Sequence, residues 1–100
     1  MGPVGADHLG VTYDVVWDIQ AAGARRRRRK EDPAGAARLT AATEALADDP
    51  RPANAVPMGG SGSYRLRLGP YRAVYELLPH KYTVHITNVG RVPPERERRP

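Results

Sequence analysis

Residues Ser63–Leu78 read SYRLRLGPYRAVYELL, in which two segments of strand-forming residues flank a Gly-Pro pair. Apolar and basic residues alternate in the first segment, and a period of two is that of a β-strand with one buried face. Gly69 can adopt the positive φ at the first central position of a type II′ turn, and Pro70 fits the negative φ at the second. The stretch therefore predicts a two-residue β-hairpin.

Three arginines lie in this predicted hairpin. Arg65 and Arg67 share the face opposite the apolar residues of their segment, about 7 Å apart along the strand, and Arg72 begins the neighbouring strand. An antiparallel sheet commonly has one solvated face, so charges alone do not demand a function. No acidic residue follows until Glu76, however, and a patch of a single charge sign is unusual on an ordinary surface. The arginines mark either a solvated face or a place where phosphate groups bind.

Upstream, the sequence predicts one strand and two helices. Residues 11–18 (VTYDVVWD) alternate with the period of a strand. Asp18 is a candidate N-cap for a helix over residues 19–31 (IQAAGARRRRRKE). Asp32, which a proline follows, is a candidate N-cap for a second helix over residues 34–47, whose apolar stripe is mostly alanine. The two helices are expected to form a hairpin.

The remaining segments complete the expected topology. Residues 48–62 (DDPRPANAVPMGGSG) are so rich in Pro and Gly that they predict an extended connection. Residues 82–89 (YTVHITNV) predict a last strand, with Tyr82, Val84 and Ile86 on its inward face. The predicted fold is α+β: an N-terminal strand, a two-helix hairpin and a three-stranded antiparallel meander, with the helices on one face of the sheet.

Composition limits the class of protein. A chain of 100 residues with 40% hydrophobic content predicts one small domain over residues 11–92, between a flexible tail at 1–10 and a charged flexible tail at 93–100. The formal net charge of +5 favours polyanionic partners, with nucleic acid the first candidate. Without cysteine there is no disulfide, thiol nucleophile or thiolate metal site.

Location and cofactors follow from the same sequence. No signal peptide or stretch of about 18 apolar residues is visible, so we expect a soluble protein of the cytoplasm. His8, His80 and His85 lack the spacing of metal ligands, and neither a metal nor a cofactor is expected.

The hairpin and the last strand resemble the RelE/ParE superfamily of bacterial toxins of type II toxin–antitoxin systems. The resemblance runs from about Val11 to Arg91 and is densest in residues 64–77 (YRLRLGPYRAVYEL) and 83–91 (TVHITNVGR). It implies a RelE-like fold and a cognate antitoxin as partner, in a toxin–antitoxin hetero-oligomer. In the members that are ribosome-dependent mRNA endonucleases, the open face of the sheet binds mRNA in the ribosomal A site.

The resemblance also implies four catalytic residues. Arg65 and Arg67 match the paired basic residues that contact phosphates and help to stabilise the attacking 2′-hydroxyl. Arg72 matches the arginine that holds the scissile phosphate, and Arg91 matches the basic residue that acts on the leaving 5′-oxygen. Because arginine does not release its proton, these side chains are expected to act as electrostatic clamps and not as general bases.

The C-terminus departs from the family pattern. Members that cleave RNA carry a further basic residue after the Gly-basic pair and a tyrosine or histidine near the end, whereas this chain has Val92 and then PPERERRP. The expected residue for proton transfer is therefore missing, which leaves open a slow or inactive enzyme. His85 shares the outward parity of its strand, but a lone strand histidine is more often a surface residue.

Other polar residues have simpler explanations. Glu76 is expected to form an exposed cross-strand ion pair, and the tyrosines at 64, 71 and 75 are expected to pack in the core or at its rim. Residues 25–30 (RRRRRK) cover every side of a helix, so one or two must point toward the sheet unless their stems turn outward. This run is either a poorly packed helix end or a second contact with ribosomal RNA phosphates.

The sequence thus predicts a toxin that cleaves mRNA on the ribosome and inhibits translation. A second hypothesis is a ParE-like or catalytically decayed member that acts by binding alone, for example to DNA gyrase. The third is a basic RNA-binding module without toxicity.

Overall fold

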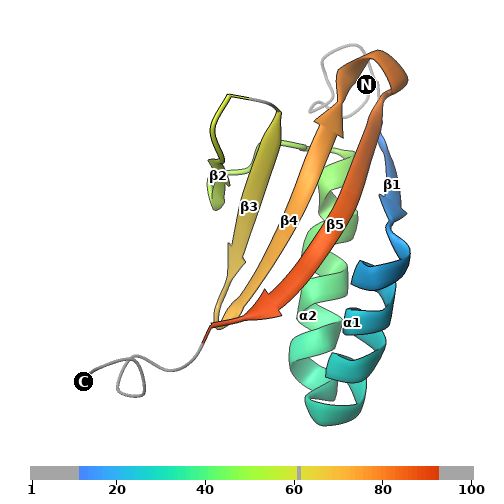
Figure 1. The fold of residues 1–100 in the computed structure, drawn as a ribbon, viewed down its shortest axis with the longest axis vertical. Helices are drawn as coiled ribbons and strands as arrows, with labels where there is room; N and C mark the ends of the chain where they lie inside the picture. The colour runs from blue at the N-terminus through green and yellow to red at the C-terminus, as the bar shows by residue number, and fades with distance from the viewer. Residues whose placement is uncertain (1–11, 61, 93–100) are drawn as a thin grey trace, which may run out of the picture.

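In the computed structural model, which describes residues 12–60 and 62–92, two helices cover one face of a five-stranded sheet (Figure 1). The predicted α+β fold is confirmed. The elements are β1 (Asp14–Trp17), α1 (Ile19–Glu31), α2 (Pro33–Glu44), β2 (Ala55–Pro57), β3 (Ser63–Leu68), β4 (Tyr71–Leu78) and β5 (Thr83–Arg91). The tails expected at 1–10 and 93–100 lie outside the described residues.

The strands run in the order β1-β5-β4-β3-β2. The meander β3-β4-β5 is antiparallel as predicted, and β1 pairs with β5 in parallel at the far edge. Leu68 is opposite Tyr71, so the turn has two residues, and Gly69 adopts a φ of +58°. The predicted hairpin is therefore confirmed, together with the role of glycine in its turn.

Two expectations were wrong. Residues 48–62 are not only a connection, because Ala55–Pro57 form β2 and pair antiparallel with β3. An edge strand needs backbone hydrogen bonds on one side only, so proline is tolerated there. Tyr82 is not an inward residue of the last strand: it precedes β5 with a left-handed φ of +47° and is 52% exposed. A left-handed residue breaks the period of two, which removes Tyr82 from the row of Val84 and Ile86.

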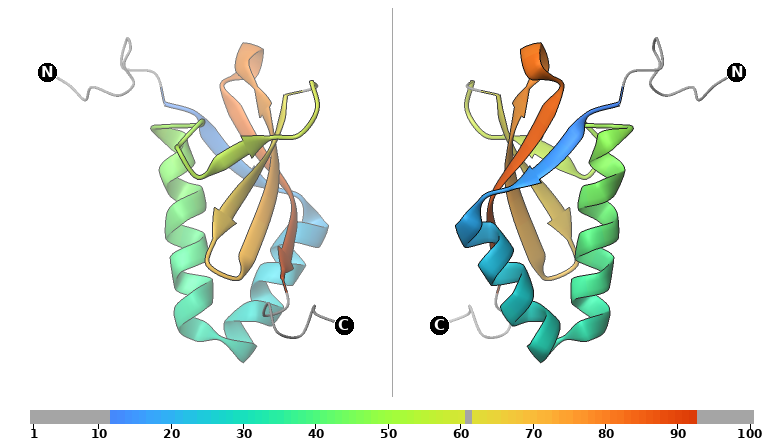
Figure 2. Two further views of the ribbon diagram at one scale, coloured as in Figure 1. Left: turned by 90° about the vertical axis from the view of Figure 1, so that its left-hand side faces the viewer. Right: turned by 90° about the vertical axis from the view of Figure 1, so that its right-hand side faces the viewer.

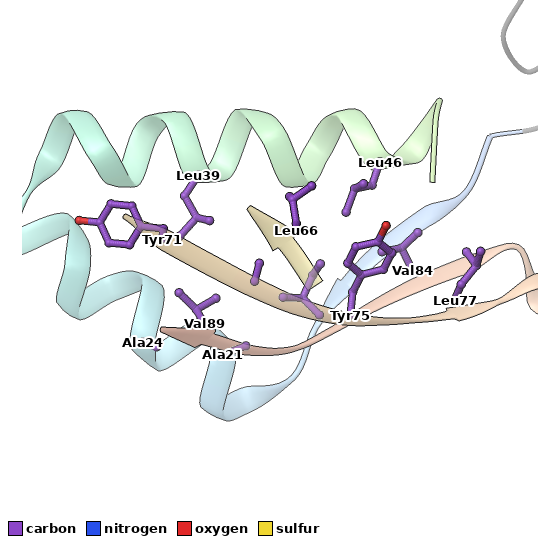
Figure 3. Close-up of a cluster of buried hydrophobic side chains, with 12 residues drawn as sticks. Ala21, Ala24, Leu39, Leu46, Leu66, Tyr71, Tyr75, Leu77, Val84 and Val89 are labelled. Atoms are coloured by element: carbon purple, nitrogen blue, oxygen red, sulfur yellow. The ribbon is translucent and has the colours of Figure 1, made fainter. Parts of the chain in front are cut away.

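The core lies between the helices and the sheet (Figure 3). The sheet contributes alternate residues of β3, β4 and β5, and α1 contributes only alanines at its contact, Ala21 and Ala24. Small side chains let α1 approach the sheet closely. Leu39 of α2 and Leu46 of the following 3₁₀ turn are completely buried, which confirms the apolar stripe expected for the second helix.

Both helices begin at the predicted caps. Asp18 Oδ2 accepts a hydrogen bond from the Gln20 N–H at 3.2 Å, and Asp32 Oδ1 accepts one from the Gly35 N–H at 3.0 Å. Side chains of this kind satisfy backbone donors that the first helical turn leaves free. α1 and α2 therefore form the expected hairpin, with Asp32 at the corner between them (Figure 2).

Tyr71 connects this corner to the sheet. Its ring is buried, and its hydroxyl donates a hydrogen bond of 2.7 Å to Asp32 Oδ2. That bond lowers the pKa of Asp32, with a smaller lowering from the Gly35 N–H, and it raises the pKa of Tyr71. A Cβ atom on Gly35 would lie 2.2 Å from Asp32 Oδ2 and 2.8 Å from Tyr71 Cε2, so only glycine fits beneath this contact.

Tyr75 connects the segment before β2 to the sheet through a hydrogen bond of its buried hydroxyl. The ring is fully buried, its hydroxyl donates to the Pro50 carbonyl oxygen at 2.6 Å, and it stacks on Tyr64 with ring centroids 5.5 Å apart. Burial raises the pKa of Tyr75 to about 12. The expectation that these tyrosines pack in the core and at its rim is confirmed.

No helix in residues 12–60 and 62–92 is long and apolar enough to cross a membrane.

Substitution by alanine is expected to change the free energy of unfolding in opposite directions at Gly35 of α2 and Gly23 of α1. Gly35→Ala should lower the free energy of unfolding by about 1–3 kcal/mol, because the added methyl overlaps Asp32 and Tyr71. Gly23→Ala should raise it by about 1 kcal/mol, because the methyl gains helix propensity and meets only side-chain atoms at 3.6 Å or more. Urea unfolding of both variants measures this, and equal effects would contradict the packing described for Gly35.

The Tyr71–Asp32 hydrogen bond should make stability depend on pH. Since the pKa of Asp32 is lowered from 3.8, its contribution is present above that pH and is lost as pH falls through the folded value. Since the pKa of Tyr71 is raised from 10.0, its contribution is present below pH 10.0 and is lost as pH rises through the folded value. The stability difference between the unmodified protein and Tyr71→Phe should therefore be largest near neutral pH.

The control is Tyr75→Phe, whose lost hydrogen bond goes to a backbone carbonyl with no titrating acid. The difference in free energy of unfolding between the unmodified protein and Tyr75→Phe should stay constant between pH 7 and pH 3. Urea unfolding at each pH measures this difference. A Tyr71→Phe difference that also stays constant over this range would contradict the assigned bond to the Asp32 carboxylate.

Candidate functional site

The face of the sheet away from the helices carries three arginines on adjacent strands. Arg67 of β3 is directly opposite Arg72 of β4, and Arg72 is opposite Gly90 of β5. Directly opposite residues of an antiparallel pair have Cα atoms about 4.5–5.5 Å apart. Arg65 lies two residues from Arg67 on the same strand face, opposite Val74. The predicted proximity of Arg72 to the β3 arginines is confirmed.

The same face is not crowded around these arginines. A Cβ atom added to Gly90 would meet nothing within 4 Å, and Arg65 and Arg67 are exposed. The next row of the face runs from Arg65 through Val74 to Asn88. A chain of phosphates could therefore lie across the strands without meeting a bulky side chain at β5.

The guanidinium of Arg72 is held in place by the backbone of the turn. Its Nη1 atom donates to the Gly69 carbonyl oxygen at 2.7 Å and to the Tyr71 carbonyl oxygen at 2.8 Å. Both acceptors are uncharged, so neither of them neutralises the positive charge of Arg72. In the described part of the chain, none of the three arginines on this face forms an ion pair. The face thus presents three cations that have no ion-pair partner within residues 12–60 and 62–92.

Arg91 does not join them. It is opposite Tyr71 and shares the parity of buried Val89, which places it on the helix side of the sheet. The pKa of Asp32, lowered chiefly by the Tyr71 hydrogen bond, is lowered further by the charge of Arg91. This agrees with a position on the helix side.

A register shift explains the placement of Arg91. Tyr75 is opposite Ile86 but Val74 is opposite Asn88, so β5 has one additional residue at Thr87. Without this shift, the period of two from Val84 and Ile86 would place Arg91 on the open face. The structure therefore brings together three of the four arginines that the sequence singled out and separates the fourth.

His85 and Glu76 occupy a different row of the open face. They are opposite each other, with Ser63 on the β3 side and Val16 on the β1 side. His85 is half-buried and outward as predicted, but its row is not that of the arginines. Glu76 makes no ion pair in residues 12–60 and 62–92, so the ion pair expected for it is absent there.

The residue before β2 makes a contact that the sequence did not reveal. The Asn54 side-chain amide donates to the Arg67 carbonyl oxygen at 2.9 Å, and the Arg67 N–H donates to the Asn54 carbonyl oxygen at 3.0 Å. This reciprocal pair fixes the backbone at the arginine strand. A single asparagine in a Pro-rich segment gives no signal for such a contact, because it depends on the pairing of β2 with β3.

Two of the five consecutive arginines in α1, Arg25 and Arg28, are partly buried. The Arg25 guanidinium carbon lies 4.2 Å from the centroid of the Trp17 ring, and Arg28 forms an ion pair of 2.8 Å with Glu31. The other basic residues of the run are exposed. No group of His, Asp or Glu in the described ranges 12–60 and 62–92 could hold a metal ion.

Comparison with known proteins adds the family. The family model described as ParE toxin of type II toxin-antitoxin system, parDE, matches residues 18–97. The chain belongs to this ParE toxin family. The resemblance to the RelE/ParE superfamily seen in the sequence is thereby confirmed, and the protein is a toxin of a type II toxin–antitoxin system. None of the curated protein sequences matches the chain.

Solved structures with the same fold come from both branches of the superfamily. The RelE–RelB complex of Pyrococcus horikoshii matches with 26% identity and a TM-score of 0.70, covering 80% of this chain and 94% of that one. The isolated RelE toxin of E. coli matches with 23% identity and a TM-score of 0.69, covering 81% and 85%. The chromosomal ParDE system of P. aeruginosa matches with 14% identity and a TM-score of 0.63, covering 82% and 98%.

Replacing the two exposed arginines of β3 should test their contact with phosphates. Arg65→Gln with Arg67→Gln should leave the free energy of unfolding within about 0.5 kcal/mol of the original, because both side chains are exposed. The salt dependence of single-stranded RNA binding, as log K against log salt, should flatten by about 0.7 for each lost phosphate contact.

The matched control is Arg38→Gln with Lys81→Gln, which removes two exposed charges from α2 and from the turn between β4 and β5. Fluorescence anisotropy over a salt series compares the pairs. If both pairs flatten the slope equally, only net charge matters and the face carries no defined contacts.

Proposed function

We propose that this toxin cleaves mRNA in the ribosomal A site, with the open sheet face as the RNA-binding surface. The observation that carries the proposal is the group of three arginines, with Arg67 directly opposite Arg72 and no ion-pair partner for any of them in the part of the chain that the structure describes. Adjacent cations with no carboxylate partner repel one another in the free protein. A polyanionic backbone would relieve that repulsion, which is the reason to expect RNA at this surface.

Arg72 has the geometry to hold a phosphate on one side of its guanidinium. Nη1 is engaged by the two turn carbonyls, and no contact in the described residues uses Nε and Nη2. These two atoms form a fork that matches two oxygens of a phosphate. The backbone of a tight turn thus holds the group in advance, so little ordering remains to be done when charge develops in the transition state.

The reaction proposed is intramolecular transesterification of RNA. The 2′-oxygen attacks the adjacent phosphorus and loses its proton, the bond from phosphorus to the 5′-oxygen breaks, and the 5′-oxygen gains a proton. The products are a 2′,3′-cyclic phosphate and a 5′-hydroxyl. Arg65, Arg67 and Arg72 stabilise the charge on the phosphate oxygens, while water supplies and accepts the protons.

Water is a poor substitute for a positioned acid or base, whose contribution is about 10²–10⁴ in rate. His85 lies in another row, and Arg91 lies on the helix side. Cleavage should accordingly be slow relative to what the same fold achieves with a proton-transfer residue beside the arginines.

The lack of a positioned acid or base beside the arginines, among the described residues, favours a second candidate. This candidate is a ParE-like toxin that inhibits a target such as DNA gyrase by binding alone. Such a toxin needs no group that transfers protons, and the family model that matches is that of ParE. In this case the arginine face would be a recognition surface and not a catalytic one.

With either activity, we propose a cognate antitoxin as the partner that holds the toxin inactive. The P. horikoshii relative was solved with RelB. Three arginines on one face of the sheet would attract an acidic segment, with charge complementarity acting mainly on the rate of association.

The test is single-turnover cleavage of mRNA in the A site of purified ribosomes. Arg72→Ala should lower the rate constant by about 10²–10³, the loss seen when one donor to a developing oxyanion is removed. Arg38→Ala, at an exposed position of α2, is the control and should cleave at the original rate. No cleavage by the unmodified protein at saturating ribosome, together with inhibition of gyrase supercoiling, would contradict the endonuclease and favour the second candidate.

A further inference from the structure

The second half of α1 carries a cationic surface separate from the arginines of the sheet. Its members are the four exposed basic residues of the run, Arg26, Arg27, Arg29 and Lys30. At about 100° per residue, these four positions cover an arc of about 160° on the helix. Ala21 and Ala24, which pack in the core, lie on the opposite side of α1. We call the four residues the α1 cluster.

The α1 cluster carries charge that no acidic residue of the described ranges neutralises through an ion pair. The one ion pair in residues 12–60 and 62–92 is Arg28–Glu31, and Arg28 is not one of the four. Pairs such as Arg26 with Lys30 or Arg26 with Arg29 are like charges at helical spacings of four and three, which destabilise a helix. Favourable interaction with the helix dipole explains basic residues in the last turn but not Arg26 and Arg27.

Gly23 gives two of these side chains a common place to lie. The position of a Cβ atom on Gly23 is 3.6 Å from Arg27 Nη1 and 3.7 Å from Arg26 Nη2. Both guanidiniums therefore place a terminal nitrogen over the same bare turn of helix. Two adjacent guanidiniums are suited to a group with several acceptor oxygens and negative charge, such as a phosphate.

The chemistry of the surrounding arc identifies the kind of partner. Protein–protein interfaces have an apolar centre, but the exposed large apolar side chain on this arc is Ile19, in the first turn and about 10 Å along the axis from Arg26. Nucleic-acid interfaces are polar and strongly positive. The arc offers charge and hydrogen-bond donors without hydrophobic anchors.

We propose that the α1 cluster is a second nucleic-acid contact that binds the phosphate backbone of a double helix without reading bases or sugars. The helix α1 lies on one side of the sheet (Figure 2). The sheet arginines face away from the helices, so the two surfaces can contact different strands of nucleic acid at once. The contact does not depend on whether the sheet face cleaves RNA or inhibits by binding.

The test measures binding of the full chain to a 20-base-pair duplex DNA and a duplex RNA of the same sequence, over a series of salt concentrations. Arg26→Gln with Arg27→Gln should reduce the slope of log K against log salt for DNA by about 0.9 per lost phosphate contact. Gln keeps helix propensity, so circular dichroism should show unchanged helix content. Duplex DNA and duplex RNA should bind with affinities within tenfold of each other.

Two further variants isolate the surface. Arg38→Gln with Lys81→Gln removes the same charge elsewhere and should change the slope by less than half as much. Arg65→Gln with Arg67→Gln should leave the α1 contribution intact, so that combining it with Arg26→Gln and Arg27→Gln gives additive losses. Failure of mRNA cleavage would leave all of these results unaffected, since the duplex probes are not cleaved.

Equal slope changes for the α1 pair and the Arg38 and Lys81 pair would overturn the proposal, because the cluster would then act only through net charge. A duplex preference above tenfold between RNA and DNA would overturn it as well. The proposal would also be overturned if a poly-glutamate peptide bound more tightly than duplex DNA of equal charge and if Arg26→Gln with Arg27→Gln abolished that peptide binding. The partner would then be an acidic protein.

Discussion

The hydrogen bond from Tyr71 to Asp32 joins the two layers of the fold at the point where both change direction. Asp32 caps α2 at the corner of the helix hairpin, and Tyr71 begins β4 directly after the turn of the β-hairpin. With the ring of Tyr71 buried against Gly35, the next residue, Arg72, must face away from the helices. One contact thus sets the corner of the helices, the face of β4 and the exposure of the arginine that is central to the proposed site.

The core beneath α1 is thin, and this limits where the basic side chains of α1 can lie. Ala21 and Ala24 bring α1 close to the sheet, which leaves little room for long inward side chains. Arg25 is accommodated by placing its guanidinium over the ring of Trp17. The remaining positive charge of α1 is displaced to the outer surface. A helix that is mostly arginine in its second half is therefore compatible with the fold without contributing an apolar stripe.

The open face has arginines that can bind anions, but its described residues place no proton-transfer group beside them. Its arginines are ordered by backbone pairing, by turn carbonyls and by the Asn54 contact to β3. Catalysis of RNA cleavage needs charge stabilisation together with two proton transfers. The described face supplies the first of these, and this difference is what separates the two candidate activities of the toxin. The membership of the ParE family is compatible with both.

The sequence alone determined those features of the fold that depend on interactions between residues close together in the chain. The hairpin followed from strict alternation around Gly69-Pro70, and both helix starts followed from aspartates at N-cap positions, because these signals depend on neighbours within four residues. The outward direction of Arg65 and Arg67 followed from the same alternation. The tertiary structure decided what depends on pairing between distant segments. β2 exists only because β3 offers a free edge, and Arg91 faces the helices because β5 gains one residue opposite β4 at Thr87. A register shift reverses every side chain beyond it, and no local pattern in β5 records where its partner strand requires one.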